Sequence, residues 1–167
     1  MNPLPWLLGL FLASCAGQGA DSVPVPPYTD MRKIERPSSP NNAVAGPAGS
    51  GRQAVDLITE PYAVAPQALY PIVKAALSTM PNTYLLAEYA DRSQMHFVVR
   101  SKVLNFPDVV SIQIETGGRE GESLITLYSR SIYGYYDFGA NKARLLPLLA
   151  RIDQAITQAE QPATQKR

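Results

Sequence analysis

The chain has 167 residues, of which 46% are hydrophobic, so it is long enough to form one domain of ordinary size with a substantial core. Its formal net charge of +1 provides no basic field that would attract nucleic acid, and no nucleic-acid partner is expected. With one Cys and one His, the chain has no intramolecular disulfide and lacks the residues for the usual zinc sites, so no metal and no cofactor are expected.

The first predicted element is a targeting segment. Residues 4–13 form a short apolar run, and the sequence Leu-Ala-Ser-Cys that follows ends at Cys15. This pattern is similar to a bacterial lipobox, in which the cysteine receives lipid and becomes the first mature residue. The run is too short for a stable membrane span. We therefore expect a lipoprotein signal peptide over residues 1–14 and a membrane anchor at the lipidated (palmitate-bearing) Cys15. The alternative is an ordinary cleaved signal peptide with an incidental cysteine.

The lipidated Cys15 and a flexible tether are predicted to occupy residues 15–35. This stretch is rich in Pro and Gly and shows no apolar periodicity, so a chain that begins near Met31 is expected to fold as well as a longer one. Ala16 rather than Asp follows the cysteine, which resembles the enterobacterial pattern for outer-membrane sorting. The expected location is the outer membrane of the bacterial cell envelope, with the domain facing the periplasm.

A single domain is predicted over residues 36–158. Residues 36–42 are polar and interrupted by prolines, which indicates an extended or turn-like surface segment, and residues 46–51 read as a loop. The first helix is predicted over residues 66–80, where apolar residues recur with helical spacing on one face. Pro71 interrupts this pattern, and a kink or a late helix start is expected there.

Four strands are predicted next, because hydrophobic and polar residues alternate with period two or β-forming residues cluster. They cover residues 83–89, 94–101, 109–115 and 123–130. A last helix is predicted over residues 141–158 with Asn141 as its N-cap, followed by a disordered tail over residues 159–167. The pattern indicates an α+β two-layer sandwich, in which an antiparallel four-stranded sheet packs against two helices in the order α-β-β-β-β-α.

The candidate site lies where the last strand passes into the last helix. Polar, aromatic and glycine residues are dense over residues 128–144. The cluster singled out as a ligand site or a structural network comprises Arg100, Arg130, Tyr133, Asp137, Asn141 and Arg144. As a ligand site, the helix N-terminus and the arginines would attract an anion. As a structural network, Asp137 would accept backbone N–H bonds or pair with Arg144, and Gly139 would take a positive φ.

Two further features have competing interpretations. His96 is a possible general base, but the sequence offers no nucleophile beside it, and a solvent-exposed histidine is expected. Tyr133, Tyr135 and Tyr136 either line an aromatic groove for a glycan, lipid or protein, or pack over the edge of the sheet.

Several short motifs together resemble the family of bacterial proteins that carry the domain of unknown function 1499. The motifs are Arg36-Pro37-Ser38-Ser39-Pro40-Asn41, Arg100-Ser101, Phe106-Pro107-Asp108, and Ser129-Arg130-Ser131 followed by Gly134, Asp137, Gly139, Asn141 and Arg144. They span nearly the whole predicted domain. The resemblance implies one compact envelope-type domain, and it brings no assigned activity, substrate or catalytic residue.

The expected function is that of a lipid-anchored binding or scaffold domain without catalysis, whose partner is an envelope protein or a small anionic ligand. The alternative is an envelope hydrolase or transferase that uses a cleft between Arg130 and Asp137. No catalytic residue is assigned from the sequence.

Overall fold

The structure is a computed structural model that describes residues 18–49 and 54–161. The predicted signal peptide and Cys15 lie outside the described residues, as do residues 162–167 of the predicted tail. In chain order the elements are η1 (Met31–Lys33), β1 (Asn42–Gly46), β2 (Leu57–Ile58), α2 (Pro66–Ser78), β3 (Thr83–Tyr89), η2 (Ala90–Arg92), β4 (Gln94–Arg100), β5 (Pro107–Thr116), β6 (Ser123–Ser131) and α3 (Ala140–Glu160).

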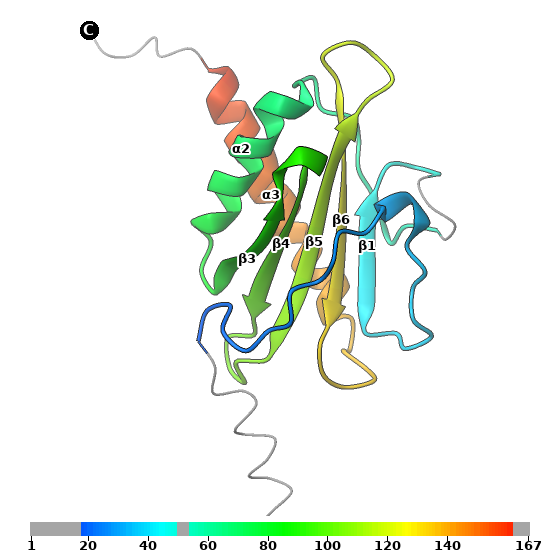
Figure 1. The fold of residues 1–167 in the computed structure, drawn as a ribbon, viewed down its shortest axis with the longest axis vertical. Helices are drawn as coiled ribbons and strands as arrows, with labels where there is room; N and C mark the ends of the chain where they lie inside the picture. Colours follow the sequence, from blue (N-terminus) through cyan, green and yellow to red (C-terminus); the bar gives the residue numbers. More distant parts are fainter. Residues whose placement is uncertain (1–17, 50–53, 162–167) are drawn as a thin grey trace, which may run out of the picture.

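The described residues form one six-stranded sheet with the strand order β2-β1-β6-β5-β4-β3, and both helices cover the same face of it (Figure 1). The α+β class is confirmed, and the four predicted strands are β3 to β6, which pair antiparallel in sequence order. The helices also form where the apolar periodicity predicts them. Pro71 and Pro147 lie on exposed faces, and α2 and α3 continue through them.

The prediction of four strands is wrong in one respect, because β1 and β2 extend the sheet at its other edge. β1 pairs antiparallel with β6, and β2 pairs parallel with β1, so the sheet is mixed. Residues 36–42 are not all surface, since Asn41 and Asn42 are buried where the chain enters β1. The sequence Asn-Ala-Val-Ala-Gly is too short to show alternation, and only its pairing with β6 makes it a strand.

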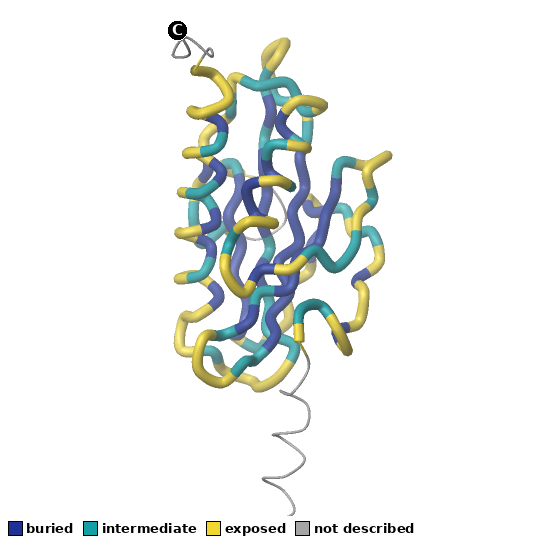
Figure 2. Tube along the Cα trace, turned by 90° about the vertical axis from the view of Figure 1, so that its left-hand side faces the viewer, coloured by how far each residue is buried: buried dark blue, intermediate teal, exposed yellow. Residues whose placement is uncertain are grey.

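The main core lies between the sheet and the two helices. It is built from aliphatic and aromatic side chains that include Leu69, Val73, Leu77, Met95, Phe97, Ile112, Leu127, Leu145, Leu148 and Ile152, and all of these are buried. Seen at right angles to the view of Figure 1, the buried residues concentrate in the strands, and exposed residues occupy the outer sides of the helices and the loops (Figure 2). In the part of the chain that the structure describes, no helix has the length and apolar character needed to cross a membrane.

The N-terminal segment, residues 18–35, crosses the sheet face that is opposite the helices (Figure 1). The sequence predicts a flexible tether here, but the described part of it packs on the domain. Val23, Met31 and Ile34 are buried, and Val23 belongs to a second, smaller core with Val98 and Val109. The domain therefore includes residues on the N-terminal side of its predicted border at residue 36.

Side chains of the sheet hold this segment by its backbone. The amide of Gln94 donates to the Thr29 carbonyl (2.7 Å) and accepts from the Thr29 N–H (3.1 Å). The Tyr89 hydroxyl donates to the Pro26 carbonyl (3.0 Å). Because these bonds use the backbone of the segment, its own side chains need no periodic pattern, and a search for periodicity misses the contact.

Candidate functional site

The turn before α3 is held by the carboxylate of Asp137. Its Oδ1 accepts from the Gly139 N–H (2.9 Å) and its Oδ2 from the Asn141 N–H (2.8 Å). Burial opposes the charged form of Asp137, but the hydrogen bonds from Asn141 and Gly139 outweigh it and lower the pKa. Gly139 has φ 80° and is the N-cap of α3, so the prediction that Asn141 caps the helix is wrong. Asp137 satisfies the free N–H groups from outside the helix instead.

Asn141 is fully buried and joins three parts of the chain. Its Nδ2 donates to Asp137 Oδ2 (2.7 Å), to the Asn41 carbonyl (2.9 Å) and to Ser131 Oγ (2.9 Å). Its Oδ1 accepts from Ser129 Oγ (2.6 Å) and from Nη1 of Arg144 (2.8 Å). These bonds fix the start of α3 against the end of β6 and against the entry to β1, which indicates a structural role for Asn141.

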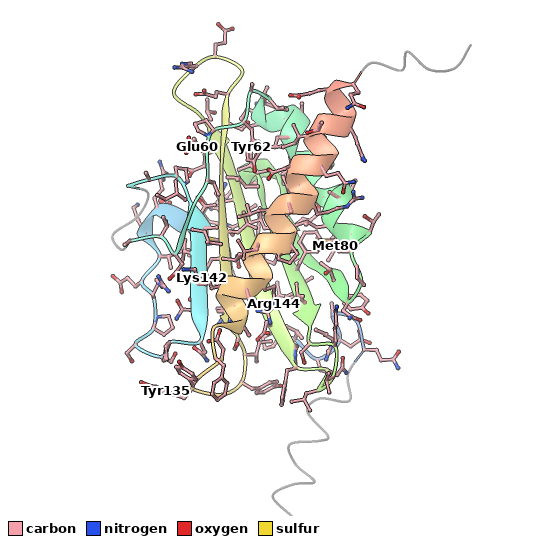
Figure 3. The ribbon with its side chains drawn as sticks, turned by 180° about the vertical axis from the view of Figure 1, so that it is seen from behind. Glu60, Tyr62, Met80, Tyr135, Lys142 and Arg144 are labelled. Atoms are coloured by element: carbon pink, nitrogen blue, oxygen red, sulfur yellow. The ribbon has the colours of Figure 1, made fainter. Side chains whose placement is uncertain are left out.

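Arg144 forms an ion pair with Asp108 at the start of β5, and both side chains are nearly buried, with 12% and 9% of their surface exposed. The predicted pair between Arg144 and Asp137 does not form, because Asn141 lies between them and contacts both. Burial raises the pKa of Asp108, and the opposing effect of Arg144 does not cancel it. Figure 3 shows Arg144 near the start of α3, above the loop that carries Tyr135.

A cleft opens beside this ion pair, between the loop of residues 101–106 and the loop of residues 132–139. Its volume is about 500 Å³, and both Asp108 and Arg144 contribute to its wall. The tips of the two loops are apolar and exposed, and these side chains are Val103, Leu104, Tyr133, Tyr135, Tyr136 and Phe138. We call this set the apolar end of the molecule.

The three tyrosines differ in how they relate to this cleft. Tyr133 and Tyr136 line it, which supports the predicted aromatic groove rather than packing over the sheet edge. Tyr136 packs edge-to-face on Phe138, with 4.9 Å between the ring centres. Tyr135 is not among the residues that line the cleft, and 69% of its surface is exposed.

The structure separates the other two arginines of the predicted cluster from Asp137. Arg100 is buried, and its guanidinium donates to the carbonyls of Gly19 (2.8 Å), Asn105 (3.0 Å) and Asp21 (3.3 Å). Arg130 lies on the sheet face opposite the helices, where it pairs in register with Val109 and lines a different cavity. A cleft between Arg130 and Asp137 therefore does not form.

His96 is fully buried, so the prediction of a solvent-exposed histidine is wrong. The ring of Tyr89 packs edge-to-face on His96, with 5.7 Å between the ring centres. Nδ1 of His96 lies 2.8 Å from Ser111 Oγ, and its Nε2 has no hydrogen-bond partner among the described residues. Burial and the charge of Arg130 lower the pKa of His96 to about 4, so the ring is neutral near pH 7.

The roles of Asp108, Ser129 and Asn41 in this network were not predicted from the sequence. Asp108 begins an apolar strand, where a carboxylate would be costly without a partner, and this position is a signal that could have identified it. Ser129 and Asn41 carry no such signal, because their roles depend on the contact between β1, β6 and α3. No group of three or more His, Cys, Asp or Glu side chains is placed to hold a metal ion within the described residues.

Comparison with known proteins adds the family. Residues 35–152 match the family described as "Protein of unknown function (DUF1499)". The chain belongs to this family. The DUF1499 match contains the whole polar network around Asn141 and both loops of the cleft, but it excludes nearly all of the N-terminal segment. No curated protein matches the chain.

Proposed function

We propose that this DUF1499 protein is a lipid-anchored binding domain of the bacterial cell envelope, without catalysis, that rests on the membrane through its apolar end. The proposal joins the lipobox-like sequence at Cys15, with its expected outer-membrane location, to the apolar loops at one end of the fold. The periplasm-facing remainder of the domain then stays free to bind an envelope partner.

The main support for the proposal is the position of the start of the described chain, which lies next to the apolar end. The guanidinium of Arg100 binds the Gly19 carbonyl and the Asn105 carbonyl together, at 2.8 and 3.0 Å. The start of the described chain therefore lies beside the loop of residues 101–106, which forms half of the apolar end (Figure 1). Cys15 precedes Gly19 by four positions, which at roughly 3.3 Å per residue reach little more than 13 Å. A lipid on Cys15 would hold this end of the molecule close to the bilayer.

The chemistry of the apolar end suits a bilayer surface. Val103 and Phe138 are each 90% exposed to solvent, and such exposure of apolar side chains is costly in water. Tyrosines such as Tyr135 and Tyr136 combine an apolar ring with a polar hydroxyl, and such residues are enriched at membrane–water interfaces. Lys102 in the wall of the cleft adds a cation that anionic headgroups attract.

A hydrolase or transferase that uses Arg130 and Asp137 receives no support from the geometry, because Arg130 lines the cavity on the sheet face opposite the helices, whereas Asp137 lies in the turn before α3 and lines the other cleft. The contact between His96 and Ser111 does not replace it. A histidine whose pKa is lowered to about 4 is a weak general base, and the described residues place no carboxylate on its free nitrogen.

The anchoring is tested with Cys15→Ser. We expect this variant to leave the membrane pellet and to accumulate in a soluble or unprocessed fraction, because the thiol that carries the lipid is gone. Fractionation after a salt wash, followed by mass measurement of the product, gives the answer. Ser14→Ala is the matched control, since it keeps a small residue before the cysteine. If Cys15→Ser is processed and still pellets with membranes after the wash, the anchoring proposal is wrong.

A further inference from the structure

A second cavity lies on the sheet face opposite the helices. Its volume is about 710 Å³, which is large enough for a small organic molecule. Residues 26–41 form one side of it, and β5 and β6 form the other. The walls combine polar and apolar side chains, and the contributing apolar residues are Pro26, Pro27, Met31, Ile34, Pro37 and Ile132.

Arg130 is the unusual residue of this cavity. It is half-buried, and none of the described residues accepts a hydrogen bond from its guanidinium or forms an ion pair with it. The other buried or half-buried arginines of the described chain are all engaged: Arg36 with Asp56 at 2.9 Å, Arg100 with three carbonyls, Arg144 with Asp108, and Arg151 with Gln154 and Thr79. A guanidinium has five N–H donors and a charge, so Arg130 is available to bind an anion in this cavity.

Ser111 supplies a second donor to the same cavity. Its Oγ lies 2.8 Å from Nδ1 of His96, and Nε2 of His96 is buried without a partner. A neutral His96 that carries its proton on Nδ1 leaves no N–H unsatisfied and donates to Ser111 Oγ. The hydroxyl hydrogen of Ser111 is then free for an oxygen atom of a ligand in the cavity.

We propose that this cavity binds a small organic monoanion, namely a carboxylate on an apolar body, with the carboxylate on Arg130 and Ser111. Arginine binds carboxylates through two parallel hydrogen bonds, and the proline and aliphatic walls suit an apolar body. A dianion fits less well, because Glu35 lines the same cavity and Lys33, the other cation in its wall, pairs with Asp30 at 3.4 Å. Ser131 lines both this cavity and the cleft of the apolar end, but none of the exposed side chains that define the apolar end lines this cavity.

The test is calorimetric titration of the full chain carrying Cys15→Ser with octanoate, octanol, octyl phosphate and acetate. Octanoate should bind saturably. Acetate and octanol should bind at least tenfold more weakly, because acetate lacks the apolar body and octanol lacks the charge. Arg130→Gln should weaken octanoate binding at least tenfold and leave octanol binding unchanged. Arg119→Gln, whose parent side chain is 88% exposed in a hairpin loop, should bind octanoate as the parent does.

The thermal midpoint of each variant establishes that it is folded. If Arg130→Gln does not fold, the parent chain still tests the site, since octanoate should shift the NMR amide signals of Ser111, Tyr128 and Ile34. The proposal is overturned if octanoate leaves these signals in place or if a folded Arg130→Gln binds it as well as the parent. Tighter binding of octyl phosphate than of octanoate overturns the selection for a monoanion.

Discussion

Arg144 and Asp108 are the residues whose removal should be most costly. Each is nearly buried, so the loss of one partner leaves the other as an unpaired buried charge. We expect Arg144→Ala to lower the free energy of unfolding by about 3–5 kcal/mol, as is typical when a buried ion pair is broken. In an Asp108→Asn background the same substitution should cost less, because no carboxylate is left unpaired.

Urea denaturation of the two single variants and the double variant measures this coupling. Lys142→Ala on the exposed side of the same helix turn is the control, and it should unfold within about 0.5 kcal/mol of the parent. Strict additivity of the Arg144 and Asp108 substitutions would contradict the role assigned to the pair.

His96 should make the stability of the protein depend on pH. In the folded chain its pKa is lowered to about 4 from the ordinary histidine value of 6.5, so between these values the unfolded chain binds a proton that the folded chain does not. The contribution of His96 to stability is therefore present above about pH 6.5 and is lost as the pH falls toward 4. The shift corresponds to a loss of about 3 kcal/mol.

The measurement compares the free energy of unfolding of the parent and of His96→Gln at pH 7 and pH 4.5. Carboxylates contribute equally to both chains, so the parent should lose about 2–3 kcal/mol more than the variant on acidification. Equal losses would show that His96 is not buried as a neutral ring.

At the scale of elements, the N-terminal segment behaves as part of the domain. It covers Val98 and Val109, and it is held by Gln94, by Tyr89 and by Arg100. A variant that begins at residue 36 exposes these two valines and leaves buried donors on the sheet without acceptors. We expect its thermal midpoint to fall by at least about 5 °C relative to a variant that begins at Gln18.

A single substitution in the full chain tests the packing of the N-terminal segment without truncation. Arg100→Ala should also lower the midpoint and should increase hydrogen exchange of amides in β4 next to the segment, because the carbonyls of Gly19 and Asp21 lose their donor. If the thermal midpoint is the same with and without residues 18–35, these residues act as the flexible tether that the sequence predicts and do not stabilise the domain.

At the scale of the whole molecule, the two loops of the apolar end should act together on a membrane. We expect the full chain with Cys15→Ser to bind vesicles that contain phosphatidylglycerol, weakly but measurably. The further substitutions Val103→Ser and Phe138→Ser should reduce the partition coefficient at least tenfold, since each removes roughly 1–1.5 kcal/mol of apolar burial.

Flotation of the protein with vesicles measures the partition coefficient. The matched control replaces Ile58 and Leu146, which are 66% and 55% exposed but lie outside the two loops, with Ser. If the control reduces binding as much as the test variant does, membrane contact is not specific to the apolar end.

Local sequence patterns were sufficient to predict several elements of the fold. Hydrophobic periodicity located α2, α3 and the four strands β3 to β6, because repeats of 3.6 and 2 residues record which side of an element is buried. Asp137 and Gly139 were also predictable, since a carboxylate and a positive-φ glycine before a helix satisfy needs that arise within a few residues. The motifs spread from Arg36 to Arg144 were enough to predict the family.

Features that depend on contacts between distant parts of the chain could be identified only from the folded structure. β1 is too short to show a period, and the N-terminal segment is held through its backbone, so neither leaves a pattern in the sequence. Neighbouring residues in a strand face opposite ways, and for that reason Ser129 joins the network of Asn141 while Arg130 faces the other cavity. The partner of Arg144 lies 36 residues away in the sequence, and His96 is buried against Tyr89 and Ser111, which come from neighbouring strands.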